Sequence, residues 1–484
     1  MSLRQLGVRL LLPLVLGITA AALLVLLLSS GERPPAPVAA TQGGCPATRG
    51  QSIEDSFFEP EERRSVDGVL STTLKASAAR AYVGQPNIAS TLFEKQFPGP
   101  TLRVCQGDTL KIKFINDTKE PSNLHTHGLH VSPKGKGDNV LLDIPPGGSW
   151  QYEYKIPHDH PPGTYWYHPH RHGYTETQVL AGLAGMLIVD GKSYDDLPGI
   201  AGARERQLVI QGTKVKNGRV VDVNDFTNTG LRFFVNGRLR PKIDLAPGEV
   251  QRWRIVNASA DFFVRLQIPG QRLNVISTDG NPLKATSAEK VVVLGAGERV
   301  EILVKGTSTP ARLETTTFQQ PYLNTKAAVL ADINPTTPAA EEGTVPGALV
   351  PFEDLRRQKV DRKRTITYSR RKVGSQLEFL VNGKQFGHHR VDQTMKLNDL
   401  EEWTIKNTTN EWHTFHIHIN PFQVVKIDGK GVDRAGYEDT VPIPPFGSVT
   451  LRQRYRSYTG QFVFHCHILG HEDAGMMSLV EIKK

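Results

Sequence analysis

A short stretch near the end of the chain combines the side chains that bind soft transition metals. The stretch QFVFHCHILGHEDAGMM contains, in order, His465, Cys466, His467, His471 and Met476. A thiolate, imidazoles and a thioether together favour copper over magnesium or calcium, and a His2Cys set with a weak axial Met is typical of an electron-transfer copper. Zinc also takes Cys and His ligands, but it has little use for a thioether. The alternative interpretation is a buried strand whose histidines are ordinary core residues.

Alternation along a β-strand divides these ligands between two sites. Residues i and i+2 of a strand point to one face, and residue i+1 points to the other. His465 and His467 therefore share a face, whereas Cys466 points to the opposite face. In the motif HTFHIH, the first histidine, His413, has the parity opposite to that of the other two and joins the cysteine side. Sorting by parity predicts one site made of His413, Cys466, His471 and Met476.

Four His-x-His pairs supply a second set of imidazoles. They are His125, His127, His168, His170, His416, His418, His465 and His467. Eight imidazoles are too many for one metal, and three metals that share them as three, three and two fit the number. A cross-strand polar ladder explains one such pair but not four. No histidine lies between Gly173 and Gly387, so we expect metal where the first and last parts of the chain meet.

The segments that must position these ligands form an internal repeat. GDTLKIKFIND (107–117), GEVQRWRIVNAS (248–259) and NDLEEWTIKNTT (398–409) share a turn, an Asn and the period-two alternation of a half-buried strand. A second recurrence, which begins at an Ile-Pro-Pro turn in both cases, links 144–170 to 443–467. Short strands between Pro/Gly turns in three related units predict an all-β fold of three β-sandwich or barrel domains.

The N-terminal residues predict export. Arg4 and Arg9 precede an apolar run at 10–28, whose nineteen residues approach the length that crosses a bilayer. Positive residues before the run place the N-terminus in the cytoplasm and the rest on the periplasmic or extracellular side. A retained anchor in the cytoplasmic membrane is favoured over a cleaved signal. The expected organisation is an anchor or signal at 1–30, a tether at 31–64, domains at 65–192, 205–334 and 360–484, and a linker at 335–359.

Composition and cysteine content narrow the function classes. Part of the net charge of +9 comes from the run at 356–372, which fits a solvated linker face better than a polyanion site. The chain shows no zinc-finger spacing and no phosphate-binding glycine loop, so we expect no nucleic-acid partner. Cys466 is claimed by the metal site, which leaves Cys45 and Cys105 as a disulfide in an oxidising compartment or as two thiols.

The four motifs HTHG, HPH, HTFHIH and HCHILGHEDAGM resemble the copper-binding motifs of the multicopper oxidases, in the family's order. The resemblance covers residues from about 65 to the C-terminus and implies three cupredoxin-like domains with four copper ions per chain. It assigns type 1 copper to His413, Cys466, His471 and Met476; type 2 copper to His125 and His416; one type 3 copper to His127, His168 and His467; and the other to His170, His418 and His465.

The resemblance implies an oxidase that couples four one-electron oxidations of a substrate to the reduction of O2 to two waters. Electrons would enter at the type 1 copper and pass through Cys466 to its two neighbouring histidines. Glu472, directly after a copper ligand, and Asp138, eleven residues after His127, are the candidates for proton delivery. The alternative for both acids is an ordinary surface carboxylate.

The sequence leaves three functions of the protein open, and they differ in the electron donor or in having none. A laccase-like oxidation of phenols or aromatic amines is the first expectation, because the Met476 thioether resembles the lower- to middle-potential members. A metallo-oxidase that acts on Cu(I), Mn(II) or Fe(II) is the alternative, with Glu411 as a docking acid near His413. The five methionines form no cluster outside the motif, which disfavours Cu(I). A non-catalytic cupredoxin-like structural protein is a remote alternative, because no ligand is missing.

Six histidines lie outside the four motifs. They are His130, His158, His160, His172, His388 and His389. We expect them at the surface or beside the ligands. The pair His158-Asp-His160 has the spacing of an auxiliary copper site, which is the alternative for that pair.

Overall fold

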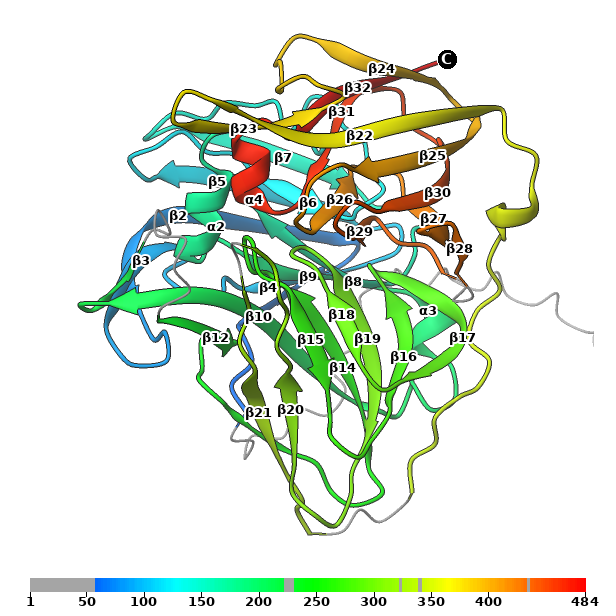
Figure 1. The fold of residues 1–484 in the computed structure, drawn as a ribbon. Helices are drawn as coiled ribbons and strands as arrows, with labels where there is room; N and C mark the ends of the chain where they lie inside the picture. Colours follow the sequence, from blue (N-terminus) through cyan, green and yellow to red (C-terminus); the bar gives the residue numbers. More distant parts are fainter. Residues whose placement is uncertain (1–56, 222–229, 322–323, 338–341, 433–435) are drawn as a thin grey trace, which may run out of the picture. The chain divides into compact units, whose positions relative to one another are not determined.

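The three repeated segments form equivalent strands in the computed structural model (Figure 1). They are β5 (Thr109–Asp117), β14 (Val250–Asn257) and β25 (Leu400–Asn407). Each pairs in parallel with a preceding strand, which is β2 (Val69–Ala81), β10 (Arg204–Lys216) or β22 (Arg362–Val373). Each also pairs antiparallel with a following strand, which is β7 (Ser149–Lys155), β19 (Arg299–Lys305) or β30 (Ser448–Arg454). The predicted repeat is therefore a repeat of strand pairing.

The structure describes residues 57–221, 230–321, 324–337, 342–432 and 436–484. The predicted anchor or signal segment and most of the tether lie outside these ranges. Within them, no helix is long and apolar enough to cross a membrane.

The strands of the described residues form five sheets. The first contains β1 (Glu62–Arg64), β4 (Thr101–Cys105), β9 (Gly185–Asp190), β8 (Gly163–His168) and β6 (His125–His127). The second, of eleven strands, contains β17 (Asn281–Glu289), β16 (Leu273–Thr278), β19, β14, β10, β11 (Arg219–Val221), β3 (Ile88–Phe93), β2, β5 and β7, with β12 (Leu231–Val235) paired to β10. The third contains β13 (Lys242–Asp244), β21 (Ala328–Asn334), β20 (Ala311–Thr315), β15 (Val264–Gln267) and β18 (Val292–Leu294).

The last two sheets come from the C-terminal part of the chain. One contains β23 (Gln376–Val381), β22, β25, β30, β27 (Phe422–Ile427) and β28 (Lys430–Gly431). The other contains β24 (Val391–Lys396), β32 (Met477–Lys483), β31 (Gly460–Cys466), β26 (His413–Ile417) and β29 (Thr440–Ile443). The short helices are α2 (Thr175–Ala181), α3 (Lys192–Asp195), η1 (Leu355–Arg357) and α4 (Leu469–Asp473).

These sheets pack as three sandwiches, which confirms the all-β prediction. In the first, buried side chains of β2, β5 and β7 meet those of β4, β8 and β9. In the second, β14 and β19 pack on β15, β20 and β21. In the third, β22 and β25 pack on β26, β31 and β32. Each core combines the inward residues of two sheets, as expected for a β-sandwich.

One sheet runs through the first two sandwiches, because β11 pairs with β3 at Arg219 and Ala89. Because the two sandwiches share this sheet, the sheet does not mark a boundary between them, and the residue limits given for the domains stay a prediction. Cys105, at the end of β4, is disulfide-bonded, so the alternative of a free thiol is wrong for this residue; Cys45, the candidate partner, lies outside the described residues.

The middle repeat differs from the sequence expectation in one respect. β5 alternates between buried and more exposed residues as predicted, but β14 is buried at every position. Arg254 of β14 donates to Glu301 on β19 and to Thr164 on β8 of the first sandwich. The second face of β14 is thus covered by the neighbouring sandwich, and its charged residues are neutralised by partners rather than by water.

Candidate metal centre

The cysteine, two histidines and methionine sorted by strand parity come together in the third sandwich. Cys466 ends β31, His413 begins β26, and His471 lies on α4. Cys466 Sγ lies 3.4 Å from His413 Nδ1 and 3.7 Å from His471 Nδ1, and the two nitrogens are 3.1 Å apart. The three ligand atoms therefore face one point, which is the arrangement that a single metal ion requires.

Backbone hydrogen bonds bring the methionine to the same place. The Cys466 amide donates to the Met476 carbonyl at 3.0 Å, and the Met476 amide donates to the His471 carbonyl at 2.9 Å. Met476 and Cys466 are both fully buried and belong to one hydrophobic cluster. The chain segment from the cysteine to the methionine thus closes as a loop around the site.

The ring of His413 is oriented by a threonine. Its Nε2 donates to Thr409 Oγ1 at 2.8 Å, because that hydroxyl already donates its proton to Asn407 Oδ1. The proton on Nε2 leaves the lone pair of Nδ1 free toward Cys466. Partners of this kind fix the tautomer of metal-binding histidines.

His471 is the residue of this group that is nearest to solvent, with 7% of its surface exposed. Its ring stacks on Phe379 with a centroid distance of 4.0 Å. Glu411 Oε2 lies 3.9 Å from His471 Nε2, and Glu411 Oε1 accepts a hydrogen bond from Arg370 Nη1 at 2.7 Å. Glu411 is itself buried, so the acid expected near His413 is a paired internal carboxylate rather than an open one.

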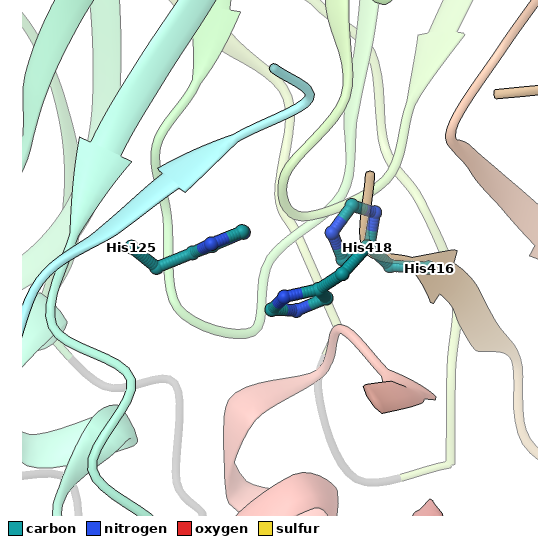
Figure 2. Close-up of side chains that lie close together, drawn as sticks. All are labelled: His125, His416 and His418. Atoms are coloured by element: carbon teal, nitrogen blue, oxygen red, sulfur yellow. The ribbon is translucent and has the colours of Figure 1, made fainter. Parts of the chain in front are cut away.

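The eight remaining imidazoles converge between the first and third sandwiches. They come from β6, from the end of β8 and the residues after it, from β26, and from the end of β31. Figure 2 shows His125 from the first sandwich facing His416 and His418 from the third. The rings of His125 and His418 stack at 3.9 Å, and those of His127 and His416 stack at 3.8 Å. The predicted meeting of the first and last parts is confirmed.

Strand pairing sets which imidazoles meet. His125 pairs with His168 across β6 and β8, and His416 pairs with His465 across β26 and β31. Three groups bring their nitrogens within 4.8 Å of one another, and they are His125, His416 and His418; His125, His127 and His168; and His170, His418 and His465. The ring of His467 lies 4.8 Å from that of His127 and 5.4 Å from that of His168. All the ligands expected from the resemblance are thus adjacent.

The free nitrogens of these rings show that metal ions fit here. Within the described residues, buried nitrogens without a hydrogen-bond partner include His125 Nε2, His127 Nδ1, His168 Nε2, His416 Nε2 and both ring nitrogens of His467. Unsatisfied buried polar atoms are rare in folded proteins and call for an explanation such as an ion. In His125, His127, His168 and His416, the other nitrogen has a protein partner within 3.1 Å, which is the pattern of metal-binding histidines.

Two predicted acids flank the imidazole cluster and are buried, so the alternative of surface carboxylates is wrong. Asp138 Oδ2 lies 2.9 Å from His125 Nδ1 and 3.6 Å from His418 Nδ1. Glu472 lies beside two other rings, 3.0 Å from His465 Nδ1 and 3.5 Å from His170 Nδ1. Burial raises the pKa of Glu472.

A third acid beside the cluster, Asp439, was not among the residues predicted from the sequence. Its Oδ1 lies 3.1 Å from His127 Nε2, and its carbonyl oxygen lies 2.9 Å from His416 Nδ1. It precedes the second Ile-Pro-Pro turn by four residues, as Asp138 precedes the first by six. The presence of an acid shortly before both repeated turns could have identified Asp439 as a counterpart of Asp138. Trp166, whose ring stacks on His168 at 4.1 Å, was missed because nothing in its sequence context marks it.

Electrostatics keep the donor atoms ready for a cation. Burial, reinforced by neighbouring imidazoles, lowers the pKa of most histidines in the cluster. The pKa of His170 falls to about 4. Burial lowers the pKa of His413 to about 3. Neutral imidazole is the form that binds metal. Burial raises the pKa of the Cys466 thiol, so a bound cation is required to hold it as a thiolate.

These pKa shifts predict that the metal-free protein loses stability on acidification. Below pH 6.5, the unfolded chain protonates histidines that the fold keeps neutral, so stability falls as the pH falls. Each histidine that stays neutral at pH 5 removes up to about 2 kcal/mol. The raised pKa values of Glu472 and Asp279 oppose this trend, but these acids are outnumbered. The melting temperature of the metal-free protein should drop between pH 7 and pH 5, and a constant or rising value would contradict the account.

The histidines outside the motifs divide into two groups. His160 donates from Nδ1 to the Pro161 carbonyl and accepts at Nε2 from the His130 amide, so both ring nitrogens are used. The alternative of an auxiliary copper site at His158 and His160 is therefore wrong. His172, His388 and His389 lie together with His170 along a cavity of about 220 Å³ at the edge of the imidazole cluster.

Comparison with known proteins agrees with this geometry. Models of the multicopper oxidase family match residues 76–194, 166–313 and 356–484. The multicopper oxidase Mco of Staphylococcus aureus is 28% identical over 440 residues, which span 88% of this chain and 91% of that protein.

Solved structures share the fold across nearly the whole length. A multicopper oxidase from Campylobacter jejuni, described as a metallo-oxidase, is 26% identical with a TM-score of 0.76, over 89% of this chain and 96% of that one. A bacterial laccase-like multicopper oxidase, CueO from Ochrobactrum sp., is 26% identical with a TM-score of 0.76, over 88% and 99%.

The fold and the Cys, His and Met donors define a copper protein built from cupredoxin-like domains. The chain belongs to the multicopper oxidase family. It is a copper-dependent oxidoreductase.

Proposed function

We propose that the protein oxidises phenols or aromatic amines, one electron at a time, and reduces O2 to two waters. The observation that carries this proposal is the position of Cys466 between two histidines of the imidazole cluster. Its Sγ faces His413 and His471, while His465 and His467 face the other ligand set. One peptide segment therefore joins an electron-accepting site to a multi-metal site through covalent bonds.

The ligand assignment that we propose uses all twelve residues. His413, Cys466, His471 and Met476 would hold a type 1 copper; His125 and His416 a type 2 copper; His127, His168 and His467 one type 3 copper; and His170, His418 and His465 the other. Copper bound in these sites supplies one-electron transfer at the first site and reduction of O2 at the cluster. The groups His413, Cys466, His471 and His170, His418, His465 match two of these sites, and His125 lies close both to His416 and to the pair His127 and His168.

The protein also has to deliver protons, because the reduction of O2 to water consumes four of them. We assign this role to Glu472 and Asp138, which contact different ligand rings of the cluster. Glu472 accepts a hydrogen bond from Thr175 Oγ1 on α2 at 3.2 Å. Since the acid is buried and its pKa is raised, it holds a proton at a pH where an exposed carboxylate has lost it.

Two observations favour organic donors over metal ions. Glu411 is buried and paired with Arg370, so it offers no open carboxylate for Fe(II) or Mn(II). The methionines of the described residues, Met186, Met395, Met476 and Met477, are all buried and present no thioether surface to Cu(I). Oxidation of Cu(I), Mn(II) or Fe(II) in metal homeostasis is the second candidate, supported by the relative described as a metallo-oxidase.

Steady-state kinetics on a phenol, Cu(I), Fe(II) and Mn(II) side by side test the substrate proposal. We expect the highest kcat/KM for the phenol. We also expect Glu411→Gln to leave the order of the four substrates unchanged. A higher kcat/KM for a metal ion, with a KM for that ion that rises in Glu411→Gln, would replace the first candidate by the second.

We also propose that residues 10–28 tether the enzyme to the outer face of the cytoplasmic membrane. The apolar run after Arg4 and Arg9 supports this location. Fractionation of cells that express the full chain should recover the oxidase with membranes, and removal of residues 1–30 should abolish that association. A full chain found in the soluble fraction would contradict the tether.

A further inference from the structure

The middle repeat contributes no histidine, yet part of it reaches the imidazole cluster. The turn before β19 contains Gly295 and Gly297, and both glycines face residues of the third sandwich. A Cβ on Gly297, which has a φ of +89°, would come within 2.9 Å of the His467 ring. A Cβ on Gly295 would come within 2.9 Å of Thr414 Oγ1. The turn thus forms a wall of the cluster.

Arg299 follows this turn and binds Asp439 of the third sandwich. The two side chains form a bidentate pair, with Nη1 to Oδ1 at 2.7 Å and Nη2 to Oδ2 at 2.6 Å. The guanidinium is fully buried and also faces Asp279 Oδ1 at 3.3 Å and the ring of Tyr165. Paired, planar contacts of this type fix orientation as well as charge.

Asp439 in turn sets the tautomers of two proposed copper ligands. Its Oδ1 accepts from His127 Nε2, which leaves the Nδ1 lone pair of His127 without a protein partner. Its main-chain carbonyl accepts a hydrogen bond from His416 Nδ1, and Nε2 of His416 then has no protein partner. The position of the Asp439 carboxylate therefore decides how the His127 ring is oriented.

Asp279 binds the backbone of both members of the pair, Arg299 and Asp439. Its Oδ2 accepts from the amides of Asp439 and Thr440, and its Oδ1 accepts from the amide of Arg299. Gly128, which directly follows His127, has a φ of +90° and leaves room for the pair. A Cβ at that position would overlap Arg299 Nη2 and lie 2.6 Å from Asp439 Oδ2. The glycine of the HTHG motif is therefore explained by this contact.

We propose that Arg299 is a positioning residue for the copper cluster: its bidentate pair with Asp439 holds that side chain in place, so that His127 and His416 present the correct nitrogens to copper. The middle domain is then a functional part of the cluster rather than a spacer. This inference rests on the proposed function, since it concerns the ligands assigned there to the type 2 and type 3 coppers.

A glycine substitution provides a first prediction. Gly128→Ala should lower the copper content of the cluster, because the new methyl group displaces Arg299 or Asp439. Gly147 is the matched control, since it has a φ of +76° but no atom within 4 Å of an added Cβ. Gly147→Ala should show only the backbone cost of about 1 to 2 kcal/mol and full copper content. Equal copper content in the two variants, measured by metal analysis, would contradict the steric argument.

The decisive experiment compares Arg299→Gln with Arg254→Gln in the full, copper-loaded chain. Arg254 is an equally buried arginine of the same sheet, but its partners are Glu205 and Glu301 rather than Asp439. We expect Arg299→Gln to lower the copper affinity of the cluster by about 10- to 100-fold. It should alter the paramagnetic resonance signal of the type 2 copper and keep the blue type 1 absorption. Arg254→Gln should lose stability but keep both signals and the full copper content.

Two further variants test whether Arg299 acts through Asp439. Arg299→Lys keeps the charge without the bidentate geometry and should restore part of the cluster copper. Arg299→Gln combined with Asp439→Asn should retain as much cluster copper as Asp439→Asn alone, because the two residues act in one path. Strictly additive losses would overturn the proposal.

The outcomes separate this inference from the proposed function. Wild-type protein that binds no copper at the cluster would refute both. If the wild type loads fully and Arg299→Gln shows the same copper content and type 2 signal, only the role of Arg299 is refuted. Equal copper loss in the Arg254 and Arg299 variants would also refute it, since burial of an arginine in this sheet would then be the whole effect.

Discussion

Replacement of Cys466 by Ser is expected to abolish both the blue absorption and the oxidation of substrate by O2, while the chain still folds. A serine hydroxyl does not supply the soft thiolate that copper selects at this site. The same substitution removes the sulfur that would connect a metal held by His413 and His471 to the peptide between His465 and His467. Turnover should fall to the rate of the uncatalysed reaction, as measured by oxygen uptake with a phenol.

The control for this variant is Met476→Leu. It also changes a fully buried side chain of the same hydrophobic cluster, but it retains Cys466. Because the axial ligand is weak and tunes the potential, the blue absorption should persist. Copper content at the imidazole cluster should be unchanged in both variants. Oxidase activity retained in Cys466→Ser would refute the proposed electron route.

Replacement of Glu472 by Gln is expected to slow the reduction of O2 by roughly 100-fold, which is typical of the loss of a positioned acid. Glutamine keeps the size of the side chain but has no proton to release. The pKa of Glu472 is raised by burial, so the acid is protonated below that pKa and loses its proton as the pH rises through it. Wild-type turnover should fall over this range, and the variant should lack that dependence.

Single-turnover mixing of the reduced enzyme with O2 measures this step directly. The matched control is Glu411→Gln, because Glu411 is a buried acid beside His471 on the electron-accepting side. It should change the oxidation of substrate but leave the reaction of the reduced enzyme with O2 unchanged. A Glu472→Gln variant that reacts with O2 at the wild-type rate across the pH range would reject the role in proton delivery.

Local sequence features were sufficient to predict the repeated strands and the two ligand sets. Strand parity separates Cys466 from His465 and His467 because it depends only on the backbone of one strand. The structure places them on opposite sides, as expected. By contrast, the full burial of β14 depends on how the first sandwich covers it, and the alternating pattern of that segment carries no sign of this contact.

The contacts that orient the ligands were harder to predict. His127 and Asp439 are separated by 312 residues, and Arg299 and Asp439 by 140. Such pairs form only when three sandwiches pack together, so periodicity and motif spacing cannot identify them. Asp138 and Glu472 were found because each lies close in sequence to a motif. Their burial, which excludes a surface position, is again a property of the packed structure.

The number of electrons that each O2 receives distinguishes complete reduction to water from release of peroxide. In the copper-loaded protein, oxygen uptake should be measured together with the oxidation of a one-electron donor and with an assay for hydrogen peroxide. We expect four donor molecules to be oxidised for each O2 consumed and no peroxide to be released. Two donor molecules for each O2, with peroxide as the product, would contradict the claim that one chain joins an electron-accepting site to a cluster that reduces O2 completely to water.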